Sequence, residues 1–136
     1  MTRSLPALVA VLAATAAGCG AANQPSQDFS GAEEDVAQVV EEFQAAAQKD
    51  EPTRICTDIL STELSRRLGE KCTATVKAAL DDADIFAVSA DSVRINGDRA
   101  RVRIDAGNDG ERQELLEMVR QDRGGWRIDR FGGEVR

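Results

Sequence analysis

The chain has 136 residues, with 17 Lys and Arg against 24 Asp and Glu, and a formal net charge of −7. This acidic balance argues against nucleic acid and against an anionic bilayer surface as direct partners, because both would repel it. The chain has no histidine, which removes the commonest general base and the commonest metal ligand. We therefore expect no catalytic constellation, no metal and no cofactor.

The N-terminal residues have the pattern of an export leader that ends at a cysteine. Arg3 precedes an apolar run, residues 5–17, which is shorter than the ~20 residues that a membrane-spanning helix needs. The run ends in Ala16-Ala17-Gly18-Cys19. Small residues directly before a cysteine resemble the lipobox of bacterial lipoproteins, although Ala16 stands where that family most often has leucine.

The lipobox resemblance implies that residues 1–18 are a signal peptide and that cleavage leaves Cys19 as the new N-terminus. It also implies a diacylglyceryl group on the Cys19 thiol and an acyl chain such as palmitate on its amino group. These chains would anchor the protein to the extracytoplasmic face of the cell membrane. The alternative is an ordinary secretory leader cut near Ala17, but a free cysteine would be a liability in an oxidising compartment.

Residues 19–30 are small and polar, and we predict a flexible tether that leads to one domain, residues 31–132. Ser30 and Glu33 fit a capping box at the start of a helix over 31–49. Apolar residues recur there at helical spacing and predict a core-facing stripe: Val36, Val39, Val40, Phe43 and Ala47.

Three shorter helical segments follow. Pro52 begins a predicted helix that ends near Leu60. Ser61 can cap a second one, which Gly69 ends. A third is expected over 71–80. The residues predicted to face inward are Ile55, Cys56, Ile59, Leu64, Leu68, Cys72, Val76 and either Ala79 or Leu80.

Cys56 and Cys72 are the two cysteines of the expected domain. Export into an oxidising compartment predicts a disulfide between them. The bond would close a loop of about 16 residues, worth on the order of 3 kcal/mol in the chain-entropy model. A redox role is the less favoured interpretation, because the spacing is not Cys-x-x-Cys.

From Asp84 the apolar period changes to two, which predicts strands. We expect a bulge near Ser92, a hairpin at Asn96-Gly97 and a turn over 107–110. Residues 111–121 suit either a helix or a strand, and we favour a strand because Gly124-Gly125 would then form a hairpin into Trp126, Ile128 and Phe131. A mobile Gly-Gly tail is predicted to end the chain.

Helices followed by an antiparallel meander predict an α+β fold in two layers. This order, with the cysteine-linked helical half and the final strand Gly-Gly-Trp-Arg-Ile-Asp, resembles the nuclear transport factor 2-like fold of ketosteroid isomerases and SnoaL-like proteins. Small exported lipoproteins of actinobacteria look similar. The resemblance implies a curved sheet around a pocket floored by helices. Enzymes of this fold often use an aspartate base with a tyrosine donor, and the chain has no tyrosine, so no catalytic residue is carried over.

Arg99, Arg101 and Arg103 alternate with Ala100, Val102 and Ile104, and therefore share the outer face of one predicted strand. Arg94 and Arg127 are candidates to join them. These arginines are a candidate docking face for an acidic partner or an anionic headgroup. Neutralisation by Asp105, Glu117 and Asp129 is the alternative. Asp81, Asp82 and Asp84 could hold Ca²⁺, but we interpret them as a solvated helix end.

The leading functional hypothesis is a non-catalytic, membrane-anchored module of the cell envelope that binds another envelope protein. The alternative is a carrier of a small apolar or lipid-like ligand inside the cone. An enzyme that uses a buried carboxylate as its base is the third and least favoured hypothesis. The aromatic residues available to line a pocket are Phe29, Phe43, Phe86, Trp126 and Phe131.

Overall fold

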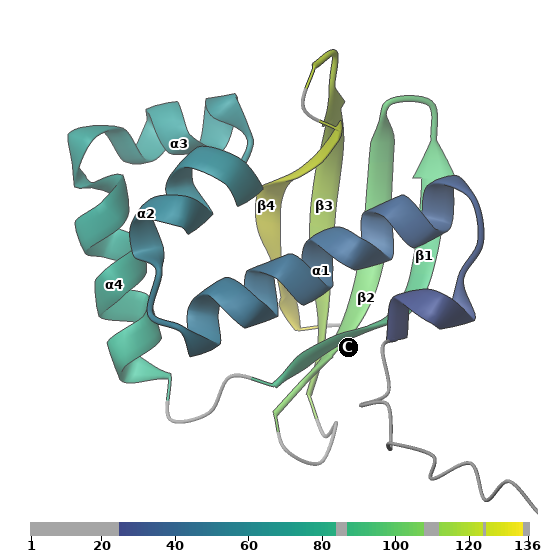
Figure 1. Cartoon of the computed structure of the whole chain (residues 1–136), viewed down its shortest axis with the longest axis horizontal. Helices are drawn as coiled ribbons and strands as arrows, with labels where there is room; N and C mark the ends of the chain where they lie inside the picture. The colour runs from purple at the N-terminus through teal and green to yellow at the C-terminus, as the bar shows by residue number, and fades with distance from the viewer. Residues whose placement is uncertain (1–24, 84–86, 108–111, 124, 135–136) are drawn as a thin grey trace, which may run out of the picture.

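The computed structural model describes residues 25–83, 87–107, 112–123 and 125–134. These form two layers, with helices covering one face of an antiparallel sheet (Figure 1). The helices are α1 (Ala32–Gln48), α2 (Pro52–Arg54), α3 (Thr62–Leu68) and α4 (Cys72–Asp82). The strands are β1 (Val88–Asn96), β2 (Arg99–Ala106), β3 (Arg112–Gln121) and β4 (Gly125–Glu134). In Figure 1, α1 crosses the sheet while α2, α3 and α4 gather beyond β4.

The helix α1 is amphipathic as predicted, but it begins differently. Its buried face includes Val36, Val40 and Phe43, which pack against the sheet. Gly31, with φ 62°, is the N-cap, and no side chain caps the helix. The predicted capping box of Ser30 and Glu33 is therefore wrong. The chain enters the helix one residue later than expected, so Ser30 lies outside the capping position.

The shorter helices follow the predicted order. α2 continues as a π-helical turn, Ile55–Ile59, in which Ile55, Cys56 and Ile59 are buried. Ser61 caps α3 by accepting a hydrogen bond from the Leu64 amide at 2.9 Å. Gly69 ends α3 with φ 64°. The predicted disulfide is confirmed: Cys56 is bonded to Cys72, the first residue of α4.

The sheet is a four-stranded meander in the order β1-β2-β3-β4. The predicted bulge lies between Ala90 and Ser92 in β1. The first hairpin is confirmed, although its loop residues are Gly97 and Asp98, one residue later than Asn96-Gly97. Gly97 has φ 63°, which suits glycine at the first loop position of a type II′ turn. Residues 112–121 form the strand that we favoured. Phe86, Gly124 and residues 108–110 of the predicted turn over 107–110 lie outside the described residues.

The core lies between the helices and the inner face of the sheet. Strand β2 alternates as predicted, with Ala100, Val102 and Ile104 buried and its arginines exposed. The other strands complete this face with Val93, Leu116, Met118, Trp126 and Ile128. Across the described residues, no helix is both long and apolar enough to cross a membrane.

Both expected domain boundaries need correction. A short 3-10 helix, Pro25–Asp28, lies inside the expected tether, and the backbone amide of Ser26 donates to Glu41 Oε1 at 2.8 Å. The domain therefore begins near Pro25 rather than at Gly31. At the other end, β4 continues to Glu134, so the two final glycines belong to a strand and not to a tail. A Cβ on Gly132 would lie 2.6 Å from the carbonyl oxygen of Leu115, so only glycine permits this close strand pairing.

A candidate ligand-binding cavity

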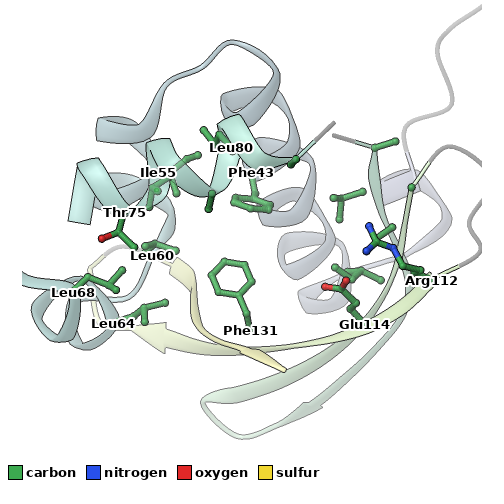
Figure 2. Close-up of a pocket in the computed structure, with 18 residues that line it drawn as sticks. Phe43, Ile55, Leu60, Leu64, Leu68, Thr75, Leu80, Arg112, Glu114 and Phe131 are labelled. Carbon is green, nitrogen blue, oxygen red and sulfur yellow. The ribbon is translucent and has the colours of Figure 1, made fainter. Parts of the chain in front are cut away.

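An apolar cavity of about 450 Å³ lies between the helices and the sheet. Figure 2 shows it enclosed by side chains from both layers. All but three of the 18 residues that line it are apolar or glycine. Its polar side chains are Thr75, Arg112 and Glu114. Most of the wall therefore offers dispersion contacts and no hydrogen bonds, which suits an apolar ligand.

The helical wall of the cavity explains why several predicted core residues are only half-buried. Leu64 and Leu68 come from α3, and Val76 and Leu80 come from α4. The sequence predicts that these four residues face inward, and they do, but the side that they face is partly the cavity. Each of these side chains thus packs against the core on one side and leaves apolar surface uncovered on the other.

Two phenylalanines of the cavity wall pack against one another. The ring of Phe43, on α1, lies 5.7 Å from the ring of Phe131, on β4 (Figure 2). Phe131 is 48% exposed, the largest exposure of any big apolar side chain among the described residues. Its uncovered surface belongs to the cavity wall. An exposed aromatic ring of this kind marks a surface that can bind apolar groups.

One end of the cavity is charged. Arg112 and Glu114 are at every second position of β3, in phase with the buried Leu116 and Met118, and so occupy inner-face positions. Figure 2 places both side chains at the end of the cavity away from Leu64 and Leu68. Within the described part of the chain, neither makes a hydrogen bond or an ion pair. Sequence reasoning missed both residues, although the same period of two, extended from Leu116, would have found them.

The predicted docking face, which we call the arginine face, consists of Arg99, Arg101 and Arg103. It lies on the opposite side of the sheet from the cavity. Arg99, Arg101 and Arg103 are exposed there. The Arg99 guanidinium lies 4.0 Å from Asp129, and the Arg101 guanidinium lies 3.8 Å from Glu117. The predicted neutralisation by these two carboxylates is therefore present. Arg103 makes no ion pair with any described residue.

Arg94 and Arg127, the two candidates to join the arginine face, differ in their contacts. Arg94 lies directly opposite Arg101 in the β1–β2 pairing, which extends the basic face across the strands. Arg127 instead donates to the carbonyl oxygen of Thr57, in the helical layer, at 3.2 Å.

The acidic end of α4 forms ion pairs with a lysine. Lys77 contacts Asp81 and also Asp50, the latter at 3.4 Å. The hydrogen bond that the Lys77 ammonium donates to Asp81 is the main cause that raises the pKa of Lys77. Over the ranges that the structure describes, no three carboxylate or thiol side chains lie close enough to hold a metal ion. Asp84, the third carboxylate of the predicted group, lies outside those ranges.

Trp126 does not line the cavity. It is 4% exposed, and the Arg120 guanidinium lies 5.3 Å from its ring. The sequence offers Trp126 as one of the aromatic residues that could line a pocket, but the structure does not place it in this cavity. Among the residues that line the cavity, Glu114 is the one carboxylate, and it is half-buried rather than fully enclosed.

Comparison with models of known protein families gave no match, and no curated protein matches the sequence. A solved structure, a nuclear transport factor 2 (NTF2-like) superfamily protein from Salmonella enterica subsp. enterica serovar Typhimurium str. LT2, superposes with a TM-score of 0.50. The match covers 82% of this chain and 92% of that chain at 10% sequence identity, which makes it a likeness of fold. The predicted α+β class, with N-terminal helices on a curved antiparallel sheet, is confirmed. The chain has the nuclear transport factor 2-like fold.

Proposed function

We propose that this protein binds a small apolar or lipid-like ligand in the cavity, without catalysis, while a lipid anchor holds it on the outer side of a membrane. The cavity of about 450 Å³ carries the proposal. Removing apolar surface from water contributes roughly 25 cal/mol per Å² to the free energy of binding. The carrier hypothesis thus has better support from the geometry than docking through the arginines.

The residues around the cavity support binding rather than catalysis. The chain has neither histidine nor tyrosine to serve as a base or a donor. Asp129 accepts a hydrogen bond from Ser61 at 2.6 Å, and neither residue lines the cavity. Glu114 is the one carboxylate in the lining, and the lining contains no thiol. The one hydroxyl in the lining belongs to Thr75.

The anchor rests on the sequence Ala16-Ala17-Gly18-Cys19 after a short apolar run. These residues lie outside the described structure. The disulfide supports export, because such bonds form and persist in oxidising compartments. Since Cys56 and Cys72 are bonded to each other, Cys19 is the remaining cysteine and the candidate for lipidation.

The ligand-binding proposal is tested by filling the cavity. Ala79 and Ala78 are neighbouring exposed residues on α4, and only Ala79 lines the cavity. We expect Ala79→Phe to weaken binding of the apolar dye Nile red about tenfold, equivalent to ~1.4 kcal/mol. Ala78→Phe should leave binding unchanged.

The chain for this test begins at Gly20 and is exported by an unrelated cleavable leader. The disulfide can then form, and no acyl chain competes for the cavity. Dye fluorescence measured during titration reports the affinity. Equal affinities in the parent chain and both variants would show that the dye binds elsewhere and would contradict the proposal.

A second candidate function is docking of an acidic envelope protein on the arginine face. The exposed Arg103 without an ion pair, next to Arg101, is the observation that favours it. Reversing both charges, Arg101→Glu with Arg103→Glu, should abolish capture of partners from envelope extracts. The matched control reverses Lys49 and Lys71, which are exposed in the helical layer. Unchanged capture after the arginine reversal would exclude this function.

A further inference from the structure

The charged end of the cavity indicates what kind of ligand the cavity takes, an inference that rests on the proposed function. Arg112 lies opposite Ala106 in the β2–β3 pairing, and Glu114 lies opposite Ile104. Both partners are buried apolar residues of the inner face. Charged side chains at such positions lose solvation unless they stay near water or gain a partner. Here they stand where the cavity meets solvent, since Arg112 is exposed and Glu114 half-buried.

The two charges have opposite sign and are neighbours on one face of β3, yet they form no ion pair with each other. Each therefore keeps its hydrogen-bonding groups available for a ligand. A guanidinium offers a planar fork of donors that matches the oxygens of a phosphate. A carboxylate attracts an ammonium group. One cation and one anion side by side complement a headgroup that carries both charges.

The remaining charge of the chain argues against singly charged headgroups. A formal net charge of −7 repels an anionic amphiphile, and Arg112 beside Glu114 offsets the attraction of that carboxylate for a cationic one. The volume also limits the tail, because about 450 Å³ lies in the lower half of the ~300–1,000 Å³ typical of small-molecule sites. This volume suits one acyl or alkyl chain better than two.

We propose that the cavity binds a single-chain amphiphile with a zwitterionic phosphate–ammonium headgroup. The chain lies among Leu64, Leu68 and Phe131. The phosphate contacts Arg112, and the ammonium group contacts Glu114. The tail thus gains burial, while the two side chains gain the partners that they lack within the described protein.

Three amphiphiles with the same dodecyl chain separate the contributions of the two charges. Dodecylphosphocholine carries both groups, dodecyl phosphate carries the anion, and dodecyltrimethylammonium carries the cation. Each is added below its micellar concentration and displaces Nile red from the chain that begins at Gly20. We expect dodecylphosphocholine to bind at least about tenfold more tightly than either of the others.

Substitutions of Arg112 and Glu114 should show which of the two residues recognises the phosphate and which recognises the ammonium group. Arg112→Gln should weaken binding of dodecylphosphocholine and dodecyl phosphate about tenfold and leave dodecyltrimethylammonium unaffected or tighter. Glu114→Gln should weaken dodecylphosphocholine and dodecyltrimethylammonium instead. Arg103→Gln is the matched control, because Arg103 lies on the outer face of the adjacent strand. It should change none of the affinities.

The outcomes separate this inference from the proposed function. If Nile red binds, Ala79→Phe weakens it, and all three amphiphiles compete equally, then the cavity binds apolar ligands but the headgroup inference is wrong. A preference for dodecyl phosphate alone, or equal effects of Arg112→Gln and Arg103→Gln, would also overturn it. If Ala79→Phe does not affect binding of any probe, the cavity is not the binding site, and the proposed function is contradicted together with the headgroup inference.

Discussion

Ser61 is almost completely buried, at 1% exposure, and its hydroxyl joins two elements. The oxygen accepts a hydrogen bond from the Leu64 amide at 2.9 Å, and the hydroxyl donates to Asp129 Oδ1 at 2.6 Å. The Ser61 amide also donates to the carbonyl of Ile128 at 2.8 Å. This residue therefore fixes the start of α3, and with it one wall of the cavity, to β4.

Replacing Ser61 by alanine should lower the free energy of unfolding by about 1–2 kcal/mol, because the helix loses its cap and Asp129 loses a donor. Urea denaturation followed by circular dichroism measures the change. Thr73→Ala is the control, since Thr73 is exposed on α4 and makes no side-chain hydrogen bond with the described residues. Equal stabilities of the two variants would show that the Ser61 contacts contribute nothing.

Single residues were also where prediction from sequence failed most often. Ser30 and Glu33 match a capping box in sequence, but the positive φ of Gly31 moves the helix start. The final glycines suggest a mobile tail because glycine costs most entropy to order. Gly132 instead allows β4 to approach Leu115. A local pattern cannot tell conformational freedom from a close contact with a residue distant in sequence.

At the scale of elements, the disulfide closes the loop that contains α3. Cys56 lies in the π-helical turn and Cys72 begins α4, with the cavity residues Leu64 and Leu68 between them. The bond thus restrains three segments that form the helical wall. The sequence predicts this pairing well, because a domain with two cysteines has one possible disulfide within the domain.

The double substitution Cys56→Ser with Cys72→Ser should cost on the order of 3 kcal/mol of stability, the loop-entropy value for a separation of 16 residues. It should also weaken Nile red binding, because the helical wall loses its restraint. Chemical denaturation and dye titration measure the two effects. The oxidised parent chain is the reference, and the reduced parent should match the double variant. Unchanged stability after reduction would contradict this role.

Strand prediction succeeded where the two faces of a strand differ. In β2 arginines alternate with apolar residues, so the burial pattern follows directly from the sequence. In β3 the residues Arg112 and Glu114 break that rule, because charged side chains occupy the inner face. A charged strand end near a turn looks solvated in sequence. The cavity beside it becomes visible only when the helices are in place.

At the scale of the whole molecule, element order was enough to predict the two-layer fold. Helices followed by a meander leave few arrangements that bury one face of each layer. The cavity could not be predicted in this way. Its volume is the difference between the space enclosed by the layers and the side chains that fill it, and no single segment determines that difference.

The membrane anchor is also a prediction about the whole molecule. Replacing Cys19 by alanine in the full chain should move the protein from the detergent-rich phase to the aqueous phase after phase separation of cells, because no acyl chains are attached. Cys56→Ser with Cys72→Ser should still be found in the detergent phase. A Cys19→Ala chain that stays with the parent protein would show that the anchor is not at this residue.

Native mass spectrometry shows directly whether the cavity holds a small ligand. The oxidised chain that begins at Gly20 is mixed with excess Nile red, and separately with excess dodecylphosphocholine, and is transferred to a volatile buffer. We expect one bound molecule per chain for the parent and for Ala78→Phe, and little or none for Ala79→Phe. Only unliganded chain in every case, or equal binding to Ala78→Phe and Ala79→Phe, would contradict it.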